Sequence, residues 1–180
     1  GFKLPVLRPA GFKAAELKAI GLKAAELGPT GAGYSVAELR GARFTAKEMR
    51  MAGYSPVEMK GGGYLTKQLK AVGVSAGELK QNGFTAEEMR IGTFSAKELK
   101  ATGYTASEMR LAGYAATALS KQDVGFSLQE LKEGGYSAPE IKMANFSSSA
   151  MRAIGFSASE MKLAGASPSE LRNAGYSASE

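Results

Sequence analysis

The side chains that could do chemistry recur every ten residues instead of gathering at one place. Glu stands one residue before a Leu, Met or Ile and two before a Lys or Arg, as in Glu98-Leu99-Lys100. These two columns hold 14 of the 17 acids and 15 of the 23 bases. Paired carboxylates serve acid–base catalysis, but a catalytic site occurs once per chain. Acids repeated in one register are therefore typical of structure.

The composition excludes several kinds of site. The 180 residues include no Cys, His or Trp, so disulfides, thiol nucleophiles, imidazole catalysis and zinc sites built from Cys and His are ruled out. The recurring Ser and Thr have no His or Lys base to activate them. Gly61-Gly62-Gly63 lacks the Lys-Ser or Lys-Thr of a phosphate loop and is interpreted as a hinge. We expect no catalytic residue, no metal ion, no cofactor and no enzyme activity.

A ten-residue consensus carries these columns: Gly, Phe/Tyr, Ser/Thr, Ala, any, Glu, Leu/Met, Lys/Arg, any, small. Numbered one to ten from the glycine, 18 copies fill the chain, and the last is truncated. All 15 aromatic residues fall at position two, and position seven is Leu, Met or Ile in the 17 copies that reach it. This regularity predicts an array of repeats with a continuous apolar row.

Each copy carries the start and stop signals of a helix. In residues 94–99, Ser95 predicts an N-cap, Glu98 completes a capping box, and the flanking Phe and Leu form a hydrophobic staple. Pro56 and Pro168 fall at the first helical position, which accepts proline. The glycine that opens the next copy suits the left-handed residue of a Schellman motif. The pattern predicts helices of about seven to eight residues.

Helices this short must stack to be stable. An isolated helix of this length does not persist in water, and burying one aromatic and one aliphatic side chain does not offset the ordering of ten residues. Large and small residues at positions nine and ten change places between copies, as in Met51-Ala52 and Ala71-Val72. This superposed period of 20 indicates two helices per layer. The sequence predicts an all-α solenoid of about 18 short helices.

The copies form one array over residues 1–180, with two irregular stretches. Residues 1–33 carry Lys3, Lys13 and Lys23 at the cap position and an insertion near the end. Regular copies fill 34–112 and 126–180. The copy at 113–125 has twelve residues before the next begins and lacks the cap, the Glu and the base. Its candidates for a bend or a partner contact are Ser120, Lys121, Gln122 and Asp123, with sequence drift as the simpler alternative.

The basic column at position eight is the candidate surface for partner binding, in a chain of net charge +6. Positions six and eight lie about 200° apart around a helix, so we expect separate acidic and basic edges. The alternative is structural, because a cation in the last turn complements the helix dipole; for stability we favour it. The basic edge comprises Arg40, Arg50, Lys60, Lys70, Lys80, Arg90, Lys100, Arg110, Lys132, Lys142, Arg152, Lys162 and Arg172.

The consensus resembles the ten-residue helical arrays of large proteins from algae and other protists, most clearly in Gly-Phe-Ser-Ala-Ser-Glu-Met-Lys at 155–162. The resemblance implies a class of repeat protein and brings no activity or cofactor. We predict a non-catalytic scaffold or linker that holds protein subunits of a larger assembly through their acidic surfaces. One alternative is a nucleic-acid-binding repeat protein, since bases and aromatics alternate. A regular surface for ice or mineral is the weaker alternative.

Two further expectations concern location. There is no apolar run near 18 residues, so no segment is expected to span a membrane. The given sequence shows no charged-then-apolar leader, which favours an intracellular or organellar location. The sequence names no compartment and no partner.

Overall fold

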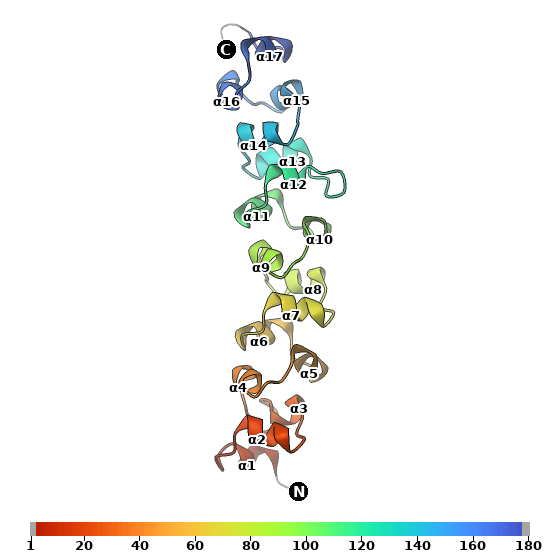
Figure 1. Ribbon diagram of the computed structural model, residues 1–180, viewed down its shortest axis with the longest axis vertical. Coiled ribbons are helices and arrows are strands. Elements are labelled where there is room, and N and C mark those ends of the chain that lie inside the picture. Colours follow the sequence, from red (N-terminus) through yellow and green to blue (C-terminus); the bar gives the residue numbers. More distant parts are fainter. Residues whose placement is uncertain (1–2, 178–180) are drawn as a thin grey trace. The chain divides into compact units, whose positions relative to one another are not determined.

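The computed structural model describes residues 3–177, which contain helices and turns and no strand (Figure 1). The described residues form seventeen helices: α1 Leu4–Leu7, α2 Ala14–Ala19, α3 Ala24–Leu27, α4 Val36–Gly41, α5 Ala46–Met51, α6 Pro56–Gly61, α7 Thr66–Ala71, α8 Ala76–Gln81, α9 Ala86–Ile91, α10 Ala96–Ala101, α11 Ala106–Leu111, α12 Ala116–Leu119, α13 Leu128–Glu133, α14 Ala138–Met143, α15 Ser148–Ala153, α16 Ala158–Leu163 and α17 Pro168–Asn173. The predicted all-α repeat fold is confirmed.

Most of these helices have six residues, and α1, α3 and α12 in the irregular copies have four. They are shorter than the seven to eight residues expected, because the residue at each end leaves the helical conformation. Ser95, before α10, has an extended backbone with ψ 156°, and Thr102, after it, leads directly into the left-handed Gly103. Each helix thus ends at the residues that directly flank it.

The predicted capping box is present at most of the regular copies, whereas α8, α15 and α17 keep only the bond to the Ser hydroxyl. The Glu98 backbone N–H donates to Ser95 Oγ at 3.2 Å, and the Ser95 N–H donates to the Glu98 carboxylate at 2.7 Å. At Lys13 and Lys23 in the irregular copies the side chain cannot accept, so only the carboxylate half remains. There the Lys13 N–H donates to Glu16 at 2.8 Å. These bonds satisfy amide groups that a helix start leaves free.

The C-terminal ends form the predicted Schellman motif. The Tyr104 N–H donates to the Leu99 carbonyl at 3.1 Å, and the Gly103 N–H donates to the Lys100 carbonyl at 2.8 Å. Gly103 has φ +85°, a conformation that costs a side-chain-bearing residue more than glycine. Arg43 and Thr93 replace this glycine and are held at φ 62° and 66°, so the neighbouring structure imposes the turn on them as well.

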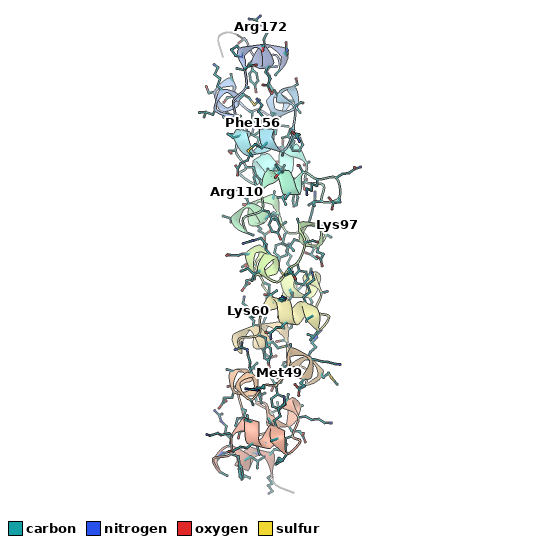
Figure 2. All side chains as sticks on the ribbon, viewed as in Figure 1. Met49, Lys60, Lys97, Arg110, Phe156 and Arg172 are labelled. Carbon is teal, nitrogen blue, oxygen red and sulfur yellow. The ribbon has the colours of Figure 1, made fainter. Side chains whose placement is uncertain are left out.

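The core is the predicted row of positions two and seven. All 17 position-seven side chains are buried, and Met49 lies among the short helices of its unit with no exposed surface (Figure 2). From Tyr34 onward most aromatic side chains are buried too. Phe12, in the irregular N-terminal copies, is 46% exposed. The row is therefore complete only from the fourth copy onward.

Contacts divide the chain into two compact units, residues 1–84 with 91–93 and residues 85–90 with 94–180. In the first unit α2 packs on α4, α4 on α6 and α3 on α5, so that α4 and α6 lie on one side in the view and α3 and α5 on the other (Figure 1). In the second unit α12 packs on α14, α14 on α16 and α15 on α17. Each unit therefore has two helices per layer, as the period of 20 predicts.

Close packing between layers limits the size of the residue at position ten in some copies. A Cβ on Gly62 would lie 2.2 Å from Val36 Cγ1, and a Cβ on Gly134 would lie 2.6 Å from the Ala106 Cβ. Both contacts join position ten of one copy to position four of the copy two before it. The combined size of these two residues is limited, so the larger Val36 is matched by a glycine.

This size limit predicts a compensating pair. Gly62→Ala alone should destabilise the fold by about 1–3 kcal/mol through overpacking against Val36. Val36→Ala alone should leave a gap and cost about 1 kcal/mol. The double variant should recover most of the stability lost in Gly62→Ala. The reason is that an alanine pair already occupies the equivalent positions elsewhere, with Ala14 at position four and Ala42 at position ten, both buried. Urea unfolding of the four proteins measures the coupling, and purely additive effects would disprove the contact.

The capping carboxylates predict acid sensitivity. Hydrogen bonds from the Ser55 N–H and hydroxyl lower the pKa of Glu58, and those from Ser157 lower the pKa of Glu160. A carboxyl whose pKa is lower in the folded state stabilises the fold above its unfolded pKa, and this contribution is lost as the pH falls through the folded pKa. We expect the melting temperature, followed by circular dichroism, to drop between about pH 5 and pH 3.

A matched variant separates this effect from general acid unfolding. Gln68 already takes the place of Glu in α7 and accepts the Leu65 N–H at 2.8 Å. Replacing Glu58 and Glu160 together by Gln should keep both caps and reduce the fall in melting temperature. A pH profile identical to that of the unchanged protein would show that these carboxylates do not control it.

Candidate functional site: the position-eight cations

The position-eight cations reach the C-terminal end of a different helix. Lys132, in the last turn of α13, donates to the Ile154 carbonyl at 2.6 Å, and Ile154 is the C-cap of α15. Arg110 Nε, from α11, donates at 2.9 Å to the carbonyl of Gly134, the C-cap of α13. The cation thus satisfies free carbonyls at the negative end of the helix two copies later.

The same cations lie over the aromatic ring that follows the capped helix. The Lys132 ammonium is 4.7 Å from the centre of the Phe156 ring, which is labelled in Figure 2. The Lys100 ammonium is 4.1 Å from the centre of the Phe126 ring. A cation at this distance is attracted by the face of the ring. One position-eight side chain therefore joins a helix end and a core aromatic of the next layer.

Several of these cations also pair with a carboxylate of the helix three copies later. The pairs Lys18–Glu48, Arg50–Glu78 and Lys142–Glu170 have N–O distances of 3.1, 2.8 and 2.9 Å. The prediction of separate acidic and basic edges is wrong for such pairs. Positions six and eight diverge on a single helix, but stacking brings them together between helices. Each pair is partly exposed and contributes at most about 1 kcal/mol.

Most predicted residues of the basic edge take part in these contacts. The cations with a described ring, carbonyl or carboxylate partner are Arg40, Arg50, Lys60, Lys70, Lys100, Arg110, Lys132, Lys142 and Arg152. Arg90 is close enough to Tyr114 to oppose the rise that burial causes in the pKa of that phenol. Lys80 is half-buried in the last turn of α8. Within residues 3–177, the structure shows no ring, carbonyl or carboxylate partner for Lys162 or Arg172.

The irregular copy places its candidates in an exposed loop between α12 and α13 (Figure 1). Ser120 is the C-cap of α12, and Lys121, Gln122 and Asp123 are exposed. The loop closes on itself, since the Gly125 N–H donates to the Lys121 carbonyl at 2.7 Å. Because Ser120 stands at position eight, this copy supplies no cation to the next layer.

The tyrosine hydroxyls form a set of contacts that the sequence does not reveal. Tyr64 donates to the Phe44 carbonyl at 2.5 Å, and Tyr136 donates to the Tyr114 carbonyl at 2.6 Å. Each bond spans two copies at position two. Burial raises the pKa of Tyr64 and of Tyr136 to about 12. Phe and Tyr share one position in the consensus, so the sequence gives no sign that the hydroxyl has a partner there.

A groove recurs beside the cations. Between α2, α3 and α5 it has a volume of about 550 Å³ and is lined by residues that include Lys18, Leu22, Lys23 and Met51. The equivalent groove between α10, α11 and α13 has a volume of about 460 Å³. Within residues 3–177 there is no group of three acidic, His or Cys side chains that could hold a metal ion.

Removing one interlayer cation tests its structural role. Lys132→Met keeps the aliphatic stem and removes the charge, so it should leave the end of α15 less well capped and cost about 1–2 kcal/mol of stability. Lys97→Met is the matched control, because Lys97 is exposed at position five. The control should change stability by less than about 0.5 kcal/mol. Equal unfolding curves for both variants would contradict the capping role.

Comparison with known proteins agrees with the repeat seen in the structure. The family model described as decapeptide repeat region matches residues 1–76, 63–124 and 117–180, which together cover the chain. Neither the curated proteins nor the solved structures give a match. Among the described residues, none of the helices has the length and apolar character needed to cross a bilayer. The stacked ten-residue units and the match along the whole sequence show that this chain belongs to the decapeptide repeat region family.

Proposed function

We propose that this chain is a non-catalytic scaffold or linker that holds protein subunits within a larger assembly. The observation that carries the proposal is that the repeated polar side chains already serve the fold. Ser95 and Glu98 cap one helix, Lys132 caps another, and the Tyr64 hydroxyl is bonded to a carbonyl. Groups bound in this way support stiffness and are poorly placed to turn over a substrate.

The surface available to partners is formed by the variable positions of the repeat. Lys47 and Lys97 at position five are exposed, and Met51 and Leu111 at position nine are 80% and 75% exposed. These positions differ widely from copy to copy, whereas the capping and core positions keep one residue type in most copies. A scaffold that varies only at its surface can present different contacts on one framework. The internal contacts of the position-eight column favour its structural role, so we place the partner surface on these positions.

Nucleic acid remains the second candidate, because the chain carries a net charge of +6. Binding of single strands usually combines basic residues with exposed aromatic faces. Here Phe44, Phe94 and Phe126 are buried, and lysines cover Phe44 and Phe126. The rings therefore favour the protein-binding proposal over base stacking.

Cross-linking in the source cells tests the scaffold. With a lysine-reactive reagent and a tagged chain, Lys47, Lys67 and Lys97 should join to other proteins, because all three are exposed. Lys132, half-buried against α15, should react much less and serves as the internal control. Cross-linked protein should persist after nuclease treatment. Recovery of nucleic acid alone, or of the chain with no second protein, would overturn the proposal.

A further inference from the structure

The positive charge of the chain is concentrated near its start. Residues 1–84 hold 13 Lys and Arg against six Glu, whereas residues 85–180 hold 10 bases against 11 acids. The excess lies mainly outside the position-eight column, at exposed residues such as Lys13, Lys23, Lys47 and Lys67. The first unit therefore presents a surface that attracts acidic partners, and the second unit does not.

The groove between α2, α3 and α5 combines this charge with apolar surface. Lys18, at one wall, is already bound to Glu48 and to the Arg43 carbonyl. Lys23 is exposed at the N-cap of α3, and within residues 3–177 its ammonium makes no hydrogen bond or ion pair. Leu22 is half-buried, and Met51 is 80% exposed. An uncommitted cation thus lies in one groove with two aliphatic side chains.

The second unit contains the same groove with different residues. Position for position, the lining of Lys18, Lys23, Phe44, Glu48 and Met51 corresponds to that of Lys100, Thr105, Phe126, Glu130 and Glu133. The cation, the ring and the carboxylate are the same in both grooves and make the contacts between layers. Thr105 replaces the free lysine, and Glu133 replaces the exposed methionine. The charged lining residues sum to +1 in the first unit and −1 in the second.

We propose that the groove between Lys23 and Met51 binds an acidic segment of a partner protein, one that presents an apolar side chain flanked by carboxylates. The inference rests on the proposed scaffold function and names its partner chemistry. A carboxylate pairs with the Lys23 ammonium, while the apolar side chain packs against Leu22 and Met51. Methionine suits this role because its flexible thioether adapts to different side chains.

The lining favours protein over nucleic acid as the occupant. The Phe44 ring is 3% exposed and the Lys18 ammonium lies 4.1 Å from its centre, so it offers no free face to a base. Leu22 and Met51 would gain nothing from a phosphate backbone. The Glu48 carboxylate in the groove would repel closely spaced phosphates, whereas a peptide can place its own carboxylates apart.

The two grooves supply the variants for a binding test. The probe is a fluorescein-labelled peptide of repeated Asp-Glu-Leu, titrated with the full chain and followed by anisotropy at low salt. Lys23→Thr with Met51→Glu gives the first groove the residues that set the charge of the second, Thr105 and Glu133, which the fold accommodates there. We expect this double variant to weaken binding at least about tenfold. Adding Thr105→Lys and Glu133→Met to that protein should restore part of the binding in the second unit, where the buried Tyr104 stands in place of Leu22.

Three controls decide between explanations. Lys97→Thr removes one positive charge outside the groove and should leave the affinity within about twofold. A peptide of Asp-Glu-Ser should bind more weakly than the Leu peptide. An oligothymidylate of equal charge should not show the same loss with the double variant. The proposal that this groove binds an acidic, partly apolar segment would be contradicted by any of three results. These are unchanged peptide affinity in the double variant, equal binding of the Ser peptide, or the same loss of affinity for the oligonucleotide. The scaffold proposal would still hold after any of these outcomes if cross-linking recovers protein partners.

Discussion

The closure of both ends of a six-residue helix is the constraint on which the structure depends. A helix leaves roughly four N–H groups at its start and four carbonyls at its end without a partner inside the helix. In a helix of six residues, almost every residue therefore has an N–H or a carbonyl that must find a partner elsewhere. The N-terminal side is closed locally, by Ser95 and Glu98 in α10. The C-terminal side is closed partly by the Schellman turn and partly by a cation from another layer, as Lys132 closes α15. Secondary and tertiary structure are therefore formed by the same contacts.

This coupling explains why chemistry-bearing residues can be so frequent without forming a site. Lys132 makes a hydrogen bond to a carbonyl and lies over Phe156, and Lys142 pairs with Glu170, so cation, ring and carboxylate bind layers together. Each contact is worth little by itself in water. Repeated between successive layers, such contacts fix the spacing at which the position-seven side chains are buried. A partner that competed for these cations would have to weaken the fold.

Much of this could be predicted from residues within one copy. Ser95, Glu98 and Gly103 act on neighbours a few residues away, so helix type, caps and the buried row follow from spacing alone. The contacts between layers could not be predicted in the same way. The hydrogen bond from Lys132 to the Ile154 carbonyl joins residues 22 apart in the sequence, and the bond from Tyr64 to the Phe44 carbonyl joins residues 20 apart. They depend on how far one helix is offset from the next, which the sequence of a copy does not state. The prediction of separate acidic and basic edges is wrong for that reason.

The interlayer contacts also show where evolution of the array is free to act. Positions two, four, six, seven, eight and ten are held by burial, capping or close approach, as the fit of Gly62 against Val36 illustrates. Position three caps the helix in most copies, but together with the exposed position nine it carries the charge difference between the grooves at Lys23 and at Thr105. A few substitutions at these exposed positions reverse the charge of a groove while its cation, ring and carboxylate stay in place. Specificity in such an array is therefore a property of individual grooves on a common framework, and copies that look alike in the consensus need not bind alike.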